Sequence, residues 1–391
     1  MHRLGVVAPL LLLATAPSPL HAQRSNAYAP VVAEVRRGIT HGLYPGGVIV
    51  VGRHDAILYA RGLGHFTWSA RSPVPDPALS RWDLASLTKI VATSAVAARL
   101  VDAGVLDLDR PVSGYVPGFT GDGRELVTVR MLLEHTSGLP SFVPLYRRAA
   151  TPAAAWDSLL VTPLLTTPGF LTRYSDLNAL LLGRVLESIA GEPLDRLSAR
   201  LVFDPLGMTH TGFTPSLSAQ RLIVPSQMEG GRPVVGAPSD PNAAFLGGVA
   251  GHAGLFATGM DLARFAQMWL SDGRTPDGPF LSPATMRAFL TPSLVGGVRR
   301  LGWDAPDSSV HPSAFGRLAD TTVVGHTGWT GTFLWIDPER DLFVVFLTNR
   351  SLDPHRRQSI IAMRDVRSRV SDAAIRASGG CGPAPPAAVE C

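Results

Sequence analysis

The sequence has little cysteine and no grouping of residues typical of a metal site. Among 391 residues only Cys381 and Cys391 are cysteines, and both lie in the Gly/Pro/Ala-rich stretch 378–391, which we expect to be a flexible tail. They either pair in an oxidising compartment or remain incidental thiols. The 11 histidines are dispersed, without a His-Glu-x-x-His pattern. These absences exclude a cysteine nucleophile and a thiolate zinc site, and we expect no metal and no cofactor.

Long apolar runs are also scarce, and the one at the N-terminus is short. After Met-His-Arg the run Leu4–Ala14 is almost wholly apolar, and two prolines and a small-residue site ending at Ala22 follow. This order is typical of a secretory signal, so we expect residues 1–22 to be a signal peptide and the mature protein to be secreted or periplasmic. No later apolar run reaches the roughly 18 residues that span a bilayer, so we expect no integral membrane segment.

Charge of one sign is nowhere concentrated. The formal net charge of +4 and the pI near 9.4 come from scattered arginines, without a basic run or basic residues interleaved with aromatic ones. The sequence therefore predicts no nucleic-acid partner. The oligomeric state does not follow from the sequence.

Lysine is rarer still: Lys89 is the only one, against 34 arginines. Arginine keeps its proton in proteins, whereas a desolvated lysine can lose it and act as a base. The single lysine is therefore a candidate for a catalytic role that needs a neutral amine. Ser86 stands three residues earlier, and the apolar run Ile90–Ala98 predicts a buried helix. Residues i and i+3 share a helix face, so we expect the Lys89 amine to reach the Ser86 hydroxyl. Backbone N–H groups at a helix start also suit an oxyanion.

A second polar segment, Tyr174-Ser175-Asp176, precedes a run with helical apolar spacing over residues 177–190. Taken alone, it is explained by Ser175 or Asp176 as a helix N-cap, with Tyr174 packed nearby. Only its combination with the other segments favours a functional interpretation.

A third segment, His326-Thr327-Gly328-Trp329, precedes two strand-like runs, Phe333–Ile336 and Leu342–Leu347. Taken alone, it is explained as the glycine-rich edge of a hairpin. Only its position after the first two segments favours a functional interpretation.

Together and in this order, the three segments resemble the serine β-lactamase and penicillin-binding protein superfamily. The class C-like branch, with its D,D-peptidases, esterases and amidases, is the nearest in pattern. That superfamily has Ser-x-x-Lys at a helix start, Tyr-x-Asn on a loop and Lys-Thr-Gly on a sheet edge. The stretch Leu132–Pro140 also matches, and the resemblance runs from about residue 28 to about residue 376.

A narrower resemblance rests on residues 240–243, 247–256 and 301–304. They look like an exported subgroup that includes serine-type N-acetylmuramoyl-L-alanine amidases. We interpret the glycine-rich run and its single His252 mainly as loop structure that marks this subgroup.

The resemblance implies an α/β (α+β) fold of the β-lactamase/transpeptidase type, with an antiparallel sheet flanked by helices and a mostly helical region. One hydrolase domain is expected over residues 23–377, with its sheet region at about 27–82 and 261–377 and its helical region at about 83–260. Expected elements are helices at 28–42 and 355–376 and strands at 47–51, 57–62, 333–336 and 342–347. The catalytic groove would lie between the two regions.

The resemblance also implies acyl transfer without a metal. Ser86 would be the nucleophile, and Lys89 and Tyr174 together would remove its proton, through a lowered lysine pKa or a lysine-stabilised phenolate. Which of the two is the base stays open. The N–H groups of Ser86 and Trp329 would form the oxyanion hole, beside Gly328.

Two departures from the family pattern restrict the substrate. Asp176 replaces the usual asparagine, and because a carboxylate cannot donate, we expect it to pair with Lys89. His326 replaces the usual lysine, so anion binding should weaken and depend on pH. Arg173 either supplies a substitute charge or is simply solvated.

The resemblance implies a small-molecule or peptidoglycan-derived substrate as the partner. The leading hypothesis is a secreted serine hydrolase acting on an amide or ester bond in a cell-wall fragment or small ester. A class C-type β-lactamase or D,D-carboxypeptidase is the alternative within the enzymes. The alternative that is not an efficient enzyme is a penicillin- or peptidoglycan-binding protein with little turnover.

Overall fold

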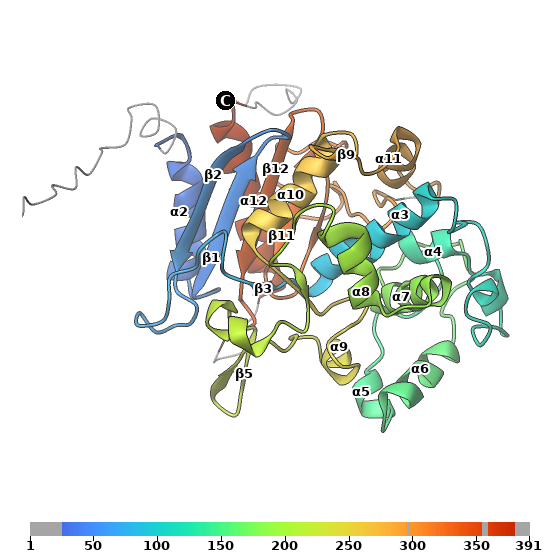
Figure 1. Cartoon of the computed structure of the whole chain (residues 1–391). Helices are drawn as coiled ribbons and strands as arrows, with labels where there is room; N and C mark the ends of the chain where they lie inside the picture. The colour runs from blue at the N-terminus through green and yellow to red at the C-terminus, as the bar shows by residue number, and fades with distance from the viewer. Residues whose placement is uncertain (1–25, 296, 354–358, 380–391) are drawn as a thin grey trace, which may run out of the picture.

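The computed structural model describes residues 26–295, 297–353 and 359–379 (Figure 1). The expected signal peptide and both cysteines lie outside the described residues. The helices are α2 (Ala29–Thr40), α3 (Ala95–Asp102), α4 (Val129–Leu133), α5 (Leu145–Arg148), α6 (Pro152–Leu160), α7 (Asp176–Ala190), α8 (Leu194–Ser198), α9 (Pro241–Phe245), α10 (Gly259–Leu270), α11 (Pro283–Leu290) and α12 (Ile360–Ala377). No helix among these residues combines the length and apolar character needed to cross a membrane.

A five-stranded antiparallel sheet forms one side of the molecule. Its strand order is β10 (Val324–Thr327), β11 (Phe333–Asp337), β12 (Leu342–Thr348), β1 (Gly46–Gly52) and β2 (Ile57–Gly64). Strands β1 and β12 come from opposite ends of the chain and pair in the centre, with Val48 opposite Leu347. The expected antiparallel sheet built from both chain ends is thus confirmed.

Helices cover both faces of this sheet, which explains why β1 and β12 are buried throughout (Figure 1). Val48 and Val50 point into a buried cluster that contains α10 and the helical region. Ile49 and Val51 point into a second cluster with α2 and α12. The alternation of side chains along one strand therefore joins two cores through a single sheet.

The region between the sheet-forming ends is mostly helical but holds short strands that the sequence did not predict. A small sheet has the order β3 (Trp82–Asp83), β7 (Leu255–Ala257) and β4 (Gly212–Phe213). Two hairpins add β5 (Gln227–Glu229) with β6 (Arg232–Val234), and β8 (Arg274–Thr275) with β9 (Gly278–Pro279). The small sheet fixes the approach of the chain to Ser86, because β3 ends three residues before it.

The segment that carries Ser86 differs from the regular helix start that its sequence predicts. A 3₁₀ turn over Ala85–Leu87 leads into a π-helical stretch, Lys89–Ser94, before α3 begins. Ala85 has a left-handed φ of 47°, which is strained for a residue with a Cβ. Such strain and π-helical turns are concentrated at functional sites.

Candidate active site

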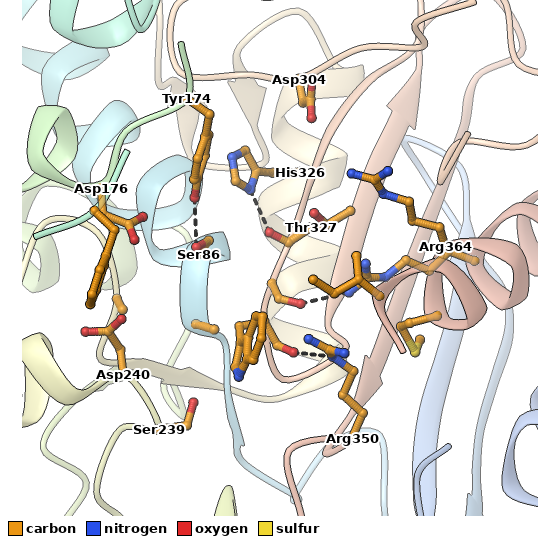
Figure 2. A pocket seen from close by; sticks show the side chains of 18 of the residues that line it. Ser86, Tyr174, Asp176, Ser239, Asp240, Asp304, His326, Thr327, Arg350 and Arg364 are labelled. Carbon is orange, nitrogen blue, oxygen red and sulfur yellow. Dashed lines mark hydrogen bonds between the residues drawn. The ribbon is translucent and has the colours of Figure 1, made fainter. Parts of the chain in front are cut away.

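The hydroxyl of Ser86 lies at the wall of a cleft with a volume of about 800 Å³. Lys89 Nζ donates to Ser86 Oγ over 3.0 Å, as the three-residue spacing predicts. Tyr174 donates its hydroxyl hydrogen to the same oxygen over 2.9 Å (Figure 2). The structure thus brings together the three residues that the sequence proposes for catalysis.

The amine of Lys89 is buried and surrounded by acceptors. Besides Ser86 Oγ, it donates to Asp176 Oδ1 over 2.8 Å and to the carbonyl oxygen of His252 over 3.1 Å. A charged ammonium has three donors and no acceptor, so three acceptors match the protonated form. Burial by itself lowers the pKa of Lys89, but Asp176 and Tyr174 outweigh it and the net pKa is raised. The lowered lysine pKa that the sequence suggested is therefore wrong for the resting site, because Asp176 holds the proton on the amine.

Tyr174 is also protonated in the resting site. Burial raises the pKa of its phenol, and the nearby charge of Lys89 offsets this only in part. The Lys89 amine lies 4.9 Å from the centre of the Tyr174 ring. If this pair accepts the Ser86 proton, as the resemblance implies, one of its two groups has to lose a proton first, so we expect hydrolysis to become faster toward alkaline pH.

His135, from the matching stretch Leu132–Pro140, holds the loop of Tyr174 on both sides. Its carbonyl oxygen accepts from the Arg173 N–H over 2.7 Å, and its Nδ1 accepts from the Ser175 N–H over 3.2 Å and from Asn178 Nδ2 over 3.1 Å. The His135 ring also packs against the Tyr174 ring, with centroids 4.8 Å apart. Burial, followed by the charges of Arg299 and Lys89, lowers the pKa of His135 well below its usual value. Because the His135 ring is neutral, its Nδ1 can accept these hydrogen bonds.

The loop after β10 is tied to the residues that precede Ser86. Thr330 Oγ1 donates to the Asp83 carbonyl over 2.8 Å, and Thr332 Oγ1 donates to the Leu84 carbonyl over 2.9 Å. A Cβ at Gly328 would lie 2.0 Å from Thr332 Oγ1 and 2.5 Å from the Leu84 carbonyl oxygen, so only glycine fits. This close approach places the loop of Trp329 beside Ser86, where an oxyanion hole would need it.

His326 is only 3% exposed and does not supply the partial charge that the sequence suggested. Burial, followed by the charges of Lys89 and Arg299, lowers its pKa well below the usual value. Its Nδ1 lies 2.8 Å from the Thr327 carbonyl oxygen, which makes Nδ1 the protonated nitrogen of a neutral ring. Nε2 is then an acceptor, and within the described residues it is buried without a partner. The expectation of a pH-dependent, part-charged His326 is wrong because burial, with the nearby charges of Lys89 and Arg299, keeps the ring neutral.

The glycine-rich run around His252, interpreted above mainly as loop structure that marks a subgroup, also helps to build the site. His252 is 1% exposed, and its Nε2 lies 2.9 Å from Asp240 Oδ1. Burial by itself raises the pKa of Asp240, but His252 and the Ala243 N–H outweigh it and lower the pKa to about 2. The Asp240–His252 pair thereby fixes the loop whose carbonyl holds Lys89.

The positive charges of the cleft come from residues that the sequence did not single out. Arg173 is not among the lining residues, whereas four other arginines are: Arg299, Arg350, Arg364 and Arg367. In a chain with 34 arginines, no local pattern distinguishes these four. The side chains that line the cleft converge from both regions of the fold (Figure 2).

One group in the described residues could hold a metal ion by geometry. Ligand atoms of His54, Asp55 and Asp341 lie within 4.8 Å of one another on the surface. None of the three lines the cleft of Ser86. A His54–Asp341 ion pair at 2.7 Å already explains their proximity.

With this geometry established, comparison with known proteins identifies the chain. The Beta-lactamase family profile matches residues 32–367. The chain belongs to the Beta-lactamase family. It is 31% identical over 346 residues to a putative D-alanyl-D-alanine carboxypeptidase of Escherichia coli K12, covering 80% of each protein. It is 32% identical over 358 residues to an N-acetylmuramyl-L-alanine amidase of Bacillus subtilis, covering 82% of this chain and 80% of the relative.

The fold agrees with this membership. A penicillin-binding protein homologue from Caulobacter crescentus superposes with a TM-score of 0.73 at 19% identity, covering 90% of this chain and 98% of that structure. The β-lactamase/transpeptidase-like fold is therefore confirmed. As a member of a family of serine hydrolases, the chain is a Beta-lactamase-family serine hydrolase.

Replacing Asp176 by Asn should move the pH–activity profile. Asp176 raises the pKa of both Lys89 and Tyr174, so its loss lowers both. Whichever group is the base, the rising limb of kcat/KM should then shift to lower pH. Asp304→Asn is the matched control, since Asp304 also lines the cleft but pairs with Arg299. If the rising limb of kcat/KM in Asp176→Asn stays at the same pH as in wild type, the assignment of the base to Lys89 and Tyr174 is contradicted.

Replacing His135 by Ala should lower kcat by about 10- to 100-fold, because the Tyr174 loop loses the Nδ1 acceptor and the ring that packs on Tyr174. His135→Gln, which keeps an acceptor, should recover part of the loss while KM changes little. The decisive measurement is a double-mutant cycle with Tyr174→Phe. If His135 acts through Tyr174, its removal costs little in the Tyr174→Phe background, whereas equal losses in both backgrounds would show a merely structural role.

Proposed function

We propose that this protein hydrolyses an amide or ester bond through an acyl-enzyme formed at Ser86. The observation that carries the proposal is the pair of hydrogen bonds to Ser86 Oγ, from Lys89 Nζ at 3.0 Å and from the Tyr174 hydroxyl at 2.9 Å, at the wall of a cleft. A serine, a protonated amine and a phenol within one hydrogen-bond network can exchange a proton with little movement.

The proposed reaction begins when the Lys89–Tyr174 pair loses one proton to solvent. Tyr174, whose hydroxyl contacts Ser86 Oγ directly, then takes the Ser86 proton as a phenolate stabilised by the Lys89 ammonium. Ser86 Oγ attacks the substrate carbonyl carbon, and the N–H groups of Ser86 and Trp329 stabilise the oxyanion. The carbon–nitrogen or carbon–oxygen bond breaks, and the leaving group takes the proton back from Tyr174. Water then hydrolyses the ester at Ser86 by the same path.

For the substrate we propose a cell-wall fragment. One relative is named a putative D-alanyl-D-alanine carboxypeptidase and another an N-acetylmuramyl-L-alanine amidase. Both names support a cell-wall fragment as the substrate. Within it we favour an N-acetylmuramyl-L-alanine amide over a D-alanyl-D-alanine end or a β-lactam. The reason is that the neutral His326, with an acceptor nitrogen, offers no positive charge where a lysine would contact a carboxylate.

We also propose that the protein is exported and that residues 1–22 are removed. The sequence pattern described above is the support for this proposal. N-terminal sequencing of protein recovered from the periplasm or medium should begin at Gln23, and a retained Met1 would contradict export by this signal.

The test of function is a parallel assay of residues 23–391 with nitrocefin, p-nitrophenyl butyrate and a muramoyl-L-alanyl peptide. Intact mass spectrometry should detect an acyl adduct, and Ser86→Ala should abolish it and lower turnover by at least about 10³-fold. Ser239→Ala is the matched control, because Ser239 lines the same cleft without contacting Lys89. The preferred substrate then selects among amidase, esterase and β-lactamase. Turnover that survives in Ser86→Ala would overturn the mechanism, and absence of any adduct would favour a binding protein.

A further inference from the structure

The side chain of Asp240 combines a fixed position with an unused oxygen. It lines the cleft, and 20% of its surface is exposed. Its Oδ1 lies 2.9 Å from His252 Nε2 and accepts from the Ala243 N–H over 2.8 Å. Within residues 26–295, 297–353 and 359–379, Oδ2 accepts no hydrogen bond. One oxygen therefore holds the side chain in place, and the other is left for a ligand.

The carboxyl group of Asp240 is ionised at neutral pH. Burial by itself raises its pKa, but His252 and the Ala243 N–H outweigh burial and lower the pKa to about 2. An ionised carboxylate has acceptors and no donor, so Oδ2 can bind only a group that donates a hydrogen. No step of the proposed acyl transfer uses this oxygen.

The exposed ring of Phe142 belongs to a loop that is bonded to α9, the helix that follows Asp240. Phe142 lines the cleft and is 44% exposed. Asn242 is fully buried, and its Nδ2 donates to the Val143 carbonyl over 2.8 Å while its Oδ1 accepts from the Tyr146 N–H over 3.3 Å. Asn242 therefore holds the backbone that carries the aromatic ring against the backbone that carries the carboxylate.

The loop is also anchored on its other side. The Ser141 carbonyl accepts from the Asp176 N–H over 2.9 Å, so the loop is tied to the start of α7 as well. Figure 2 shows Asp176 and Asp240 on one side of Ser86 and Arg350 on the other. The carboxylate and the aromatic ring thus belong to a wall of the cleft that is built before a ligand binds, away from the arginines.

The chemistry of this wall matches a saccharide ring. A pyranose ring presents C–H groups on its faces and hydroxyl groups around its edge. An aromatic ring packs against the former, and an ionised carboxylate accepts from the latter. A cationic donor is disfavoured, because four arginines and only three carboxylates line the cleft and the charge of Lys89 already acts on Asp240. The cleft volume of about 800 Å³ is ample for such a ligand.

We propose that Asp240 and Phe142 form a saccharide subsite, in which a sugar hydroxyl donates to Asp240 Oδ2 and one face of the sugar ring packs on Phe142. The inference rests on the proposed function and specifies it further: the part of the cell-wall fragment that lies against this wall is the muramyl sugar and not the peptide. Asp240 is then a specificity-determining residue, besides holding the loop of His252.

Two substrates that share one amide bond and one peptide test the subsite. N-acetylmuramyl-L-alanyl-D-isoglutamine carries the sugar, whereas (R)-2-methoxypropanoyl-L-alanyl-D-isoglutamine keeps the ether oxygen and lacks the ring. Wild-type enzyme should prefer the first in kcat/KM, measured by release of L-alanyl-D-isoglutamine. In Asp240→Asn, the ratio of the two kcat/KM values should fall about 10- to 100-fold, the range of a hydrogen bond to a charged group. In Phe142→Ala, it should fall about 2- to 10-fold, the range of an aromatic contact.

The ratio separates recognition of the sugar from the role of Asp240 in holding the His252 loop. Loss of that role alone would lower kcat/KM for both substrates by the same factor and leave the ratio unchanged. Two matched controls should keep the wild-type ratio. Asp304→Asn removes a carboxylate that lines the cleft but pairs with an arginine, and Phe170→Ala removes a ring that is 77% exposed outside the cleft. No preference in wild type, or an unchanged ratio in Asp240→Asn or Phe142→Ala, would overturn the proposal.

A binding measurement keeps this test distinct from the test of the nucleophile. Ser86→Ala enzyme can be titrated in a calorimeter with N-acetylmuramic acid methylamide and with (R)-2-methoxypropanoic acid methylamide, both of which are neutral. Tighter binding of the sugar compound, weakened at least about 10-fold when Asp240→Asn is added, would support the subsite even if Ser86 forms no adduct. Equal affinities for the two compounds would overturn the subsite even if Ser86 is acylated.

Discussion

The buried ammonium of Lys89 is the interaction on which the rest of the site depends. A cation without solvent is tolerated only when its donors are satisfied, and here the acceptors come from three segments far apart in sequence. Ser86 comes from its own turn, Asp176 from the start of α7 and the His252 carbonyl from the glycine-rich loop. One charge thereby fixes the relative positions of Ser86, Asp176 and the glycine-rich loop of His252. The same charge helps to keep His135 neutral, and with it the acceptor that positions Tyr174.

A second set of contacts joins the sheet to the turn that carries Ser86. The loop Gly328–Thr332 is held from one side by Arg367 and from the other by two threonine hydroxyls bonded to the carbonyls of Asp83 and Leu84. The sheet edge and the turn of Ser86 therefore form one rigid unit. In this arrangement a reacting carbonyl would meet backbone donors whose positions are set before it binds, which is the condition for electrostatic stabilisation.

Much of this arrangement follows from the sequence, and the exceptions have identifiable causes. The strands near residues 46–64 and 333–348 contain apolar or alternating runs, so they were predictable, and the i to i+3 spacing predicts the contact of Lys89 with Ser86. The π-helical stretch was not predictable, because no local propensity distinguishes it from an α-helix. His135 acts through contacts with Ser175 and Asn178, which are 40 and 43 residues away in the chain. The arginines that line the cleft are among 34 without a distinguishing pattern. The sequence-based expectation for His326 was wrong because burial lowers the pKa of its ring, and the sequence alone does not show that this side chain is buried.

The central pairing of β1 with β12 also determines when the protein can fold. Val48 cannot meet Leu347 until almost the entire chain has been made, so no stable sheet, and no covered face for α2 or α10, exists before then. The early strands remain without partners during synthesis, and a long-range closure of this kind is slow relative to local helix formation. The cleft at Ser86 is therefore completed late, because its lining residues come from the helical region and from the last strands and helix of the chain.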